Sequence, residues 1–288
     1  MAINVIGRVY FGTTGQDTLE GSSGSDTFHM TANDYVTDTI IGGAGSDTVD
    51  YSPSQVGVKI TLTDPPLKGG LPSGGTVEAD FLKLAYDPST HTIKSSTHHQ
   101  VVANLTSIEN ATGSNFNDTL TGNSSGNVLK GGAGDDVIDG RGGNDVIYSG
   151  LGADTLTGGL GSDTFVFTDY RDSGITSVPL SGGGYNTVNH GLDTIMDFLS
   201  GVDKIDLSQM DADITRDGNQ AFHIVDQLSG HAGELRVFLG TDYDSHDPID
   251  EGFFILQGDV DGDGNVDFQL TAQTQSIDIV HPATDFLL

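Results

Sequence analysis

The sequence predicts an all-β protein in which short parallel strands stack as a coil. Three observations support this prediction: a nine-residue repeat, an excess of glycine and a strongly acidic charge. Six copies of the repeat follow one another without a gap from Gly113 to Val166, and further copies begin at Gly12, Gly21 and Gly42. A fixed period of this kind is typical of solenoids, so we expect each copy to supply one structural unit.

Each unit divides into a loop and a strand. The first six residues are rich in glycine, and the last three carry Thr or Val followed by a large apolar residue, as in GGAGDDVID from Gly131. One large apolar residue in nine cannot form a core alone, so two units should make each turn of the coil, with the eighth residues stacked inside. These residues are Leu19, Phe28, Val49, Leu120, Leu129, Ile138, Ile147, Leu156 and Phe165.

The sixth residue of the unit is Asp in every clear copy except one, where it is Asn127, and a degenerate copy from Asn33 supplies Asp38. With two units per turn, each loop should lie against the loop two units further on. We therefore expect Asp136 to lie between Asp118 and Asp154. The remaining expected pairs are Asn127 with Asp145 and Asp145 with Asp163.

Stacked carboxylates repel unless a cation lies between them, and glycine-rich loops expose backbone carbonyls. Ca²⁺ accepts about 6–8 oxygen ligands in flexible geometry, so the loops predict several Ca²⁺ ions. The alternative is a set of ordinary Asp-Gly turns. The predicted ligands of the repeats and their flanks are Asp17, Asp26, Asp38, Asp47, Gly113, Asn115, Asp118, Asn127, Gly131, Gly132, Gly134, Asp136, Gly140, Gly143, Asp145, Gly150, Gly152, Asp154, Gly159, Gly161, Asp163 and Asp193.

The composition agrees with a cation-dependent fold. The chain has 41 Asp and Glu residues against 11 Lys and Arg residues, for a formal net charge of -30, which argues against nucleic acid as a partner. Self-repulsion on this scale disfavours compaction unless cations neutralise the carboxylates. The chain has no Cys, so neither disulfides nor thiolate metal sites are available.

A second calcium pattern lies near the C-terminus. The segment from Asp259 to Leu270 follows the EF-hand loop at Asp259, Asp261, Asp263 and Asp267, but Leu270 stands where a bidentate Glu is expected. An Asp-Gly hairpin turn between two strands explains the same residues. The sequence leaves both interpretations open.

The nonapeptides resemble the repeats-in-toxin (RTX) family, in which such an array forms a parallel β-roll lined with calcium ions. Downstream, segments 193–210, 231–238 and 258–270 resemble the C-terminal domain of serralysin-type metalloproteases. The resemblance implies a parallel β-roll with a β-rich insertion and a β-rich C-terminal cap. The expected divisions are repeats at 1–52, the insertion at 53–112, the main array at 113–166 and the cap at 167–288.

The resemblance also implies a secreted, extracellular protein of a Gram-negative bacterium. Such relatives leave through a type I (ABC) exporter and carry an uncleaved signal at the C-terminus, where Asp285, Phe286, Leu287 and Leu288 match the pattern. The alternative is a last strand with no recognition role. The first residues lack a basic segment followed by an apolar run, so we expect no N-terminal signal peptide.

The zinc-binding H-E-x-x-H helix of serralysins has no counterpart in the sequence. We therefore expect a non-enzymatic protein acting at a host or bacterial cell surface, on a polysaccharide or on a membrane. The alternative is the calcium-binding and secretion region of a serralysin-like or other extracellular enzyme. In either case the exporter is the expected partner.

Other patterns have ordinary explanations. The G-x-S-x-G string around Ser124 lies inside the array, so we expect a loop residue and not a nucleophile. His91, His98 and His99 are expected at the surface, with a transition-metal site as the alternative. Residues 56–64 alternate like a strand, 65–75 read as a loop, and 77–87 fit either a short helix or a strand pair.

Overall fold

The structure is a computed structural model of the whole chain. It describes residues 8–12, 16–31, 37–64, 75–87, 92–173, 175–179, 185–189, 191–240, 252–274 and 281–288. For residues 77–87, 92–102, 175–179, 185–189, 240 and 282–283 it describes the backbone alone. The predicted loop at 65–74 and His91 lie outside the described residues.

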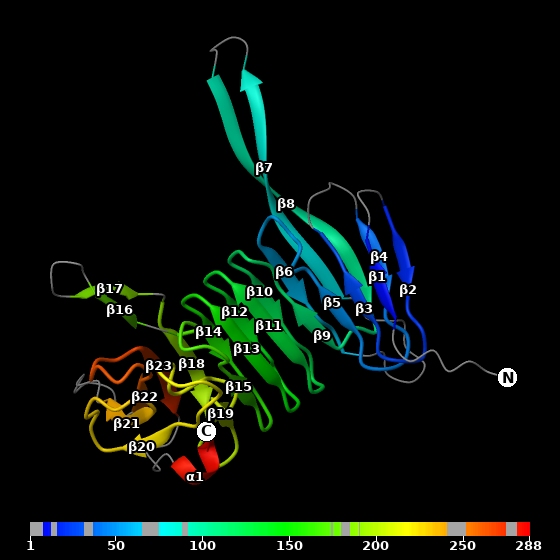
Figure 1. Cartoon of the computed structure of the whole chain (residues 1–288). Helices are drawn as coiled ribbons and strands as arrows, with labels where there is room; N and C mark the ends of the chain where they lie inside the picture. The colour runs from blue at the N-terminus through cyan, green and yellow to red at the C-terminus, as the bar shows by residue number, and fades with distance from the viewer. Residues whose placement is uncertain are drawn as a thin grey trace, which may run out of the picture.

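Two large sheets form the molecule, and their strands alternate along the chain (Figure 1). In the described residues the first sheet contains, in order across it, β1 (Val9–Phe11), β3 (Thr27–His29), β5 (Thr48–Asp50), β9 (Asn110–Thr112), β11 (Val128–Ala133), β13 (Val146–Leu151), β15 (Thr164–Val166), β19 (Lys204–Asp206) and β24 (Phe286–Leu287).

The second sheet carries the alternate strands and the cap. Its described strands, in order across the sheet, are β2 (Thr18–Glu20), β4 (Asp38–Ile41), β8 (Thr92–Thr106), β7 (Gly75–Asp87), β6 (Val58–Thr61), β10 (Thr119–Thr121), β12 (Val137–Asp139), β14 (Thr155–Thr157), β18 (Asp193–Phe198), β23 (Phe268–Thr274), β22 (Gly252–Asp259), β21 (Glu234–Gly240) and β20 (His223–Val225). A separate hairpin joins β16 (Ile175–Pro179) to β17 (Tyr185–Asn189), and α1 covers Pro282–Asp285.

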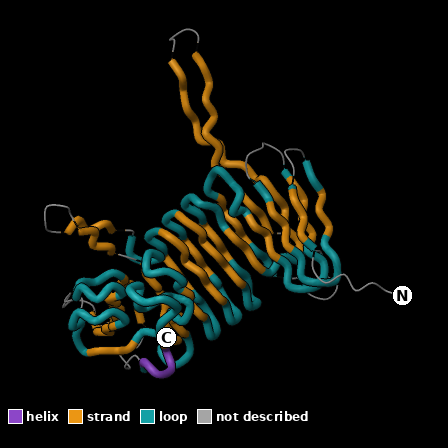
Figure 2. The backbone as a smooth tube through the Cα atoms, viewed as in Figure 1, coloured by secondary structure: helices purple, strands orange, loops and turns teal. Residues whose placement is uncertain are grey.

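The register confirms a coil of two nonapeptides per turn. β10 pairs in parallel with β12, which places Leu120 beside Ile138, and β11 pairs in parallel with β13, which places Leu129 beside Ile147. Each partner is two units further along the chain. The loops between these strands form two rows along the edges of the roll, one on either side of the strands (Figure 2).

The eighth residue of each unit forms the core, as predicted. From Phe28 to Phe165 these side chains are fully buried, whereas Leu19 is only partly buried at the end of the roll. Burial of one such side chain stabilises the fold by about 1.5–3 kcal/mol. The stack continues past the last nonapeptide through Ile195 and Ile205, so the cap extends the same two sheets.

The region between the two arrays contributes to both the roll and a projecting hairpin. β6 pairs with β10, and β9 lies between β5 and β11, so parts of residues 53–112 complete coils of the roll. β7 and β8 pair antiparallel, from Gly75 opposite Leu105 to Asp87 opposite Thr92, and they extend away from the roll (Figure 1). Residues 77–87 are therefore a strand. The four domain divisions remain predictions.

The cap closes the end of the roll that lies away from β1 (Figure 1). β18 pairs in parallel with both β14 and β23, and β21, β22 and β23 then form an antiparallel unit. Inside it the ring of Phe254 meets those of Phe198 and Phe286 edge to face, with centroids 5.2 Å and 6.3 Å away. The fold is an all-β parallel β-roll with a β-rich cap, as predicted.

Candidate metal centres

The sixth residues form a ladder along each loop row. In one row, the backbone N–H of Asp118 donates to Oδ1 of Asp136 at 2.8 Å, and the N–H of Asp136 donates to Oδ1 of Asp154 at 2.8 Å. The N–H of Asp154 then donates to Oδ1 of Asp193 at 2.8 Å. Each carboxylate thus accepts a hydrogen bond from the backbone of the preceding coil, and the ladder continues into the cap.

The other loop row has the same ladder. The N–H of Asn127 donates to Oδ1 of Asp145, the N–H of Asp145 donates to Oδ1 of Asp163, and the N–H of Asp163 donates to Oδ1 of Asp203, over 2.7–3.0 Å. All the expected pairs therefore lie in contact. Their role as calcium ligands stays a prediction.

The N-terminal repeats continue both rows. The N–H of Asp17 donates to Oδ1 of Asp38, and that of Asp26 donates to Oδ1 of Asp47. The backbone N–H of Asp47 in turn donates to Oε2 of Glu109 at 2.8 Å. At the other end, the N–H of Arg8 donates to Oδ1 of Asp26, so an arginine occupies the sixth position of the first coil.

Sequence reasoning missed two members of the ladder, Glu109 and Asp203. Each is followed by a short strand whose second residue is apolar and buried, Ala111 after Glu109 and Ile205 after Asp203. This pattern of an acidic residue followed two positions later by a buried apolar residue is the signal that could have identified them. The loop before Glu109 has no glycine, and the loop before Asp203 retains only Gly201.

Six carboxylates of the ladder keep one oxygen without a partner. In the described residues, Oδ2 has neither a hydrogen-bond partner nor exposure to solvent in Asp47, Asp136, Asp145, Asp154, Asp163 and Asp193. A buried acceptor without a donor is costly, and a buried unpaired charge is more so. Such oxygens are expected where an absent cation completes the site.

Electrostatics agree with this interpretation. Burial raises the pKa of Asp136 to about 8, and burial raises the pKa values of Asp145 and Asp154 to about 7. Burial, together with repulsion from Asp154, raises the pKa of Asp193 well above its usual value. Without a cation, burial disfavours the ionised form of these carboxyl groups at neutral pH. A bound cation favours the ionised form and so lowers their pKa values.

The glycines make room for these oxygens. A Cβ built at Gly131 would lie within 3.0 Å of both Oδ2 of Asp136 and the carbonyl oxygen of Ser149 in the next coil. Oδ2 of Asp136 and the carbonyl oxygen of Ser149 therefore both lie beside Gly131. Oδ2 of Asp136 has no hydrogen-bond donor. Oxygen-only surroundings in which carboxylates and carbonyls meet suit Ca²⁺, so the residues present fit the ion.

The predicted loop glycines fall into two groups. At Gly113, Gly131 and Gly140 a Cβ would collide with the carboxylate of the same loop. The others adopt positive φ, which L side chains rarely do. They are Gly132, Gly134, Gly143, Gly150, Gly152, Gly159 and Gly161.

Some sixth residues have no free oxygen, because their own loop satisfies it. In the loop from Gly113, the N–H of Ser114 donates to Oδ2 of Asp118 at 2.5 Å, while Asn115 is exposed at the loop tip. The N–H of Ser22 donates to Asp26 and that of Asn123 donates to Oδ1 of Asn127.

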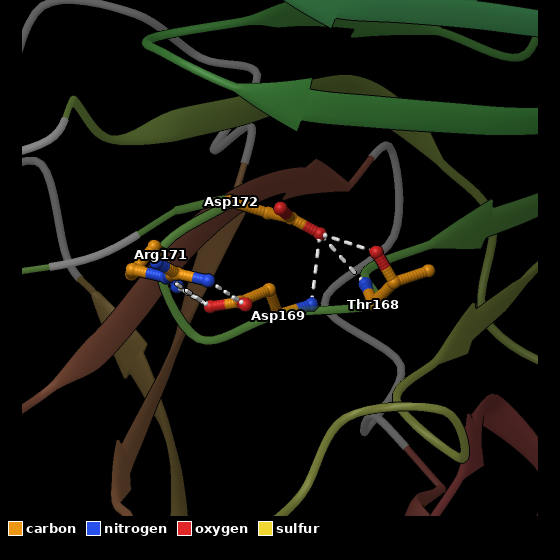
Figure 3. Close-up of polar contacts among 4 residues, drawn as sticks. All are labelled: Thr168, Asp169, Arg171 and Asp172. Carbon is orange, nitrogen blue, oxygen red and sulfur yellow. Dashed lines mark hydrogen bonds and ion pairs between the residues drawn. The ribbon is translucent and has the colours of Figure 1, made fainter.

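The turn after β15 repeats this arrangement outside the nonapeptides (Figure 3). Oδ2 of Asp172 accepts the N–H and hydroxyl of Thr168 and the N–H of Asp169. Arg171 forms an ion pair with Asp169 on the exposed side of the turn. Asp172 is buried, and the turn leads directly into the cap.

The family of the chain can now be stated. A family model described as the Peptidase M10 serralysin C terminal matches residues 97–281, more than half of the chain. The chain belongs to this serralysin C-terminal family. A second model, the RTX calcium-binding nonapeptide repeat, matches residues 9–29 and 37–52. Both families are typical of secreted, extracellular proteins, and Ca²⁺ is the ion that RTX nonapeptides bind.

Similar solved structures come from Azotobacter vinelandii. The AlgE6R3 subunit of its mannuronan C5-epimerase is 24% identical, with 55% of this chain and 71% of that chain covered and a TM-score of 0.35. The AlgE6R2 subunit is 25% identical, with 62% and 91% covered and a TM-score of 0.40. The fold of the RTX protein rests on its own strand pairing. No curated protein has a significant match to the chain.

The EF-like loop of this RTX protein is the hairpin turn between β22 and β23. Carboxylate oxygens of Asp259, Asp261 and Asp267 lie within 4.8 Å of one another, whereas Asp263 instead accepts hydrogen bonds from Asn265. Asp259 accepts the N–H groups of Gly262 and Gly264, as in a hairpin turn. Leu270 is buried in β23, so the twelfth position belongs to the core.

The last four residues of this family member are built into the cap. Oδ1 of Asp285 accepts the N–H of Gly201, and its Oδ2 accepts the hydroxyl of Ser200 and the N–H of His281. Phe286 is buried and pairs with Ile205, while Leu287 is exposed and Leu288 packs partly against the core.

The remaining patterns of this family member have ordinary surroundings where the structure describes them. Ser124 lies in a roll loop, where its N–H donates to Asp64. His98 and His99 lie in β8, opposite Phe81 and Asp80 of β7. In the described part of the chain no helix is long and apolar enough to span a membrane.

Proposed function

We propose that this chain is a secreted, non-enzymatic calcium-binding protein that crosses its type I (ABC) exporter unfolded and folds outside the cell when it binds Ca²⁺. The observation that carries the proposal is the set of six buried carboxylates whose Oδ2 has no partner. The ladder ligands named above would hold the ions. At the calcium concentrations outside cells these sites fill, whereas inside the cell they stay empty.

The physical basis is linkage between binding and folding. Ca²⁺ that binds only the folded chain stabilises it by RT ln(1 + [L]/Kd) at each site. Each ion also removes repulsion between carboxylates such as Asp136 and Asp154, since burial and then the charge of Asp154 raise the pKa of Asp136. Several sites in one cooperative coil then give a steep response to calcium. The net charge of -30 keeps the calcium-free chain expanded.

The test is circular dichroism during a calcium titration, with reversal by EGTA. We expect a disordered spectrum without calcium and a cooperative gain of β signal with it. A triple variant, Asp136→Ala, Asp145→Ala and Asp154→Ala, should need far more calcium. A complete β signal at zero calcium that these changes leave unaltered contradicts the proposal.

Export by a C-terminal signal agrees with the environment of the last residues. Asp285 and Phe286 are buried in the folded cap, so an exporter would read them only in the unfolded chain. Deletion of residues 285–288 should leave the protein inside a host that carries a type I exporter. The Asp136→Asn protein, altered far from the C-terminus, is the control and should be exported normally. Normal export of the deletion variant would place the signal elsewhere.

The proposal includes a surface role, and the two families that match the chain are typical of extracellular proteins. We propose a host or bacterial cell surface, a polysaccharide or a membrane as the target. Calcium-dependent retention on immobilised polysaccharide, on vesicles or on cells discriminates among these targets. No calcium-dependent retention on any of them would contradict a surface role.

The second candidate function is the calcium-binding and secretion region of an extracellular enzyme. The match to the serralysin C-terminal family favours it, because that family is named for a part of a protease. A longer open reading frame that joins this region to a catalytic domain would decide for it.

A further inference from the structure

The loops around the sixth residues fall into two conformational classes. In what we term closed loops, the N–H of the second residue donates to the sixth side chain, and the N–H of the fourth residue donates to the second side chain. Ser22, Ser114 and Asn123 hold the second position in such loops. The fourth residues, Gly24, Phe116 and Ser125, complete the turn.

In what we term open loops, the second and fourth residues both have positive φ. In the loop of Asp136 these are Gly132 and Gly134, both with φ of 117°. The loop of Asp145 has Arg141 with φ of 68° as its second residue, a conformation that a non-glycine residue rarely adopts. The remaining open loops are those of Asp47, Asp154 and Asp163.

The two classes match the state of the sixth carboxylate without exception among the described nonapeptides. Every open loop has an Oδ2 without a partner, and no closed loop does. The positive φ values therefore coincide with the loss of the donor that closed loops supply. An open loop thus lacks the two internal hydrogen bonds of a closed loop, and its sixth carboxylate has an oxygen without a donor.

We infer that calcium binds at the open loops only and that the closed loops are ion-independent turns that keep their shape without it. This inference rests on the proposed function and deepens it. It removes Asp26, Asp118 and Asn127 from the predicted ligands and keeps Asp47, Asp136, Asp145, Asp154 and Asp163. The two classes differ at the second residue of the loop, which is Ser in the GSSGSD of Asp26 and Gly in the GGAGSD of Asp47.

The closed loop already supplies what a cation would. Oδ2 of Asp118 accepts a backbone N–H, and the hydroxyl of Ser114 lies 3.0 Å and 3.1 Å from its two oxygens. An ion at this oxygen would displace donors and expose buried N–H groups, which costs about 1–3 kcal/mol for each group. An ion at an open loop displaces no donor at all.

Asn127 is a natural variant of the sixth position that supports the inference. An amide has no charge and only one oxygen, so it makes a poor Ca²⁺ ligand in place of a carboxylate. Asn127 lies in a closed loop, where its Oδ1 accepts the N–H of Asn123 at 2.9 Å. The uncharged sixth residue thus lies in a closed loop, where we infer that no calcium binds.

The experiment compares Asp→Asn variants of the full chain in the two classes. Calcium bound to folded protein is measured by equilibrium dialysis at saturating calcium, with folding verified by circular dichroism. Asp136→Asn and Asp145→Asn should each lower the bound calcium by about one ion and shift the folding midpoint to higher calcium. Asp118→Asn and Asp26→Asn should leave the calcium bound to folded protein unchanged, because the N–H of the second residue can still donate to the amide oxygen, as that of Asn123 does to Oδ1 of Asn127.

The outcomes separate the inference from the proposed function. A wild-type chain that binds no calcium overturns the proposed function. A wild-type chain that binds calcium, with Asp118→Asn losing an ion as Asp136→Asn does, overturns only the inference. If the open-loop variants do not fold, the closed-loop variants still decide, because a loss of calcium from either one contradicts ion-independent turns.

Discussion

The backbone N–H of Asp136 donates a 2.8 Å hydrogen bond to Oδ1 of Asp154, the equivalent residue one coil further on. Oδ2 of Asp154 has no partner and no exposure. The two oxygens of one carboxylate thus have different roles. Oδ1 accepts a hydrogen bond from the neighbouring coil, and Oδ2 is available to a ligand. The sixth residue of an open loop is therefore both a structural acceptor and a candidate calcium ligand.

Without calcium, acid should stabilise the protein. Burial raises the pKa of Asp136 from 3.8 to about 8 and those of Asp145 and Asp154 to about 7. The folded state then binds these protons more tightly than the unfolded state, so the stabilisation is complete below pH 4 and is lost as the pH rises toward 8. Circular dichroism in calcium-stripped buffer should show more β signal at pH 5.5 than at pH 8.

Calcium should weaken or reverse this dependence, since protons compete for the same oxygens. The same two pH values at saturating calcium are the control. A calcium-free β signal that increases with pH would show that the buried carboxylates are not the groups that set the stability.

Gly131→Ala should destabilise the roll because a Cβ there would approach both Asp136 and the carbonyl of Ser149. Overpacking of this kind costs about 1–3 kcal/mol, and displacement of the carboxylate should also weaken calcium binding. Gly252→Ala is the matched control, since its Cβ would meet only a side-chain carbon of Thr274 at 3.7 Å. Calcium-dependent unfolding of both variants measures the effect, and equal midpoints contradict it.

The fold was predictable from the sequence because one period fixes both the strand pairing and the core. The eighth residues and the paired Asp residues follow from the nine-residue frame alone. Glu109 and Asp203 could not be found this way, since β8 and the cap supply their coils and only Gly201 remains of the loop glycines. The state of Asp118 was also hidden, because it depends on the hydrogen bond from the N–H of Ser114 and not on the residue at position six.

The EF-like loop should depend on Asp259 for its shape. Both oxygens of Asp259 accept backbone N–H groups, from Gly262 at 2.7 Å and Gly264 at 2.9 Å, and the residue is fully buried. Asp259→Ala leaves these donors unpaired and should cost about 2–4 kcal/mol of unfolding free energy. Asp263→Ala, at an exposed position of the same loop, should change it by less than about 0.5 kcal/mol. Urea unfolding at saturating calcium measures both.

Phe286→Ala should destabilise the folded cap even though the residue lies third from the end of the chain. Its ring is buried, packs edge to face against Phe254 with centroids 6.3 Å apart, and belongs to a strand paired with β19. Removing a buried aromatic ring costs about 3–5 kcal/mol. Leu287→Ala in the same strand is the control, because this side chain is 39% exposed. Unfolding of refolded protein in calcium, with no exporter present, should separate the two variants. Equal stability would mean that β24 contributes nothing to the cap and that the C-terminal residues serve recognition alone.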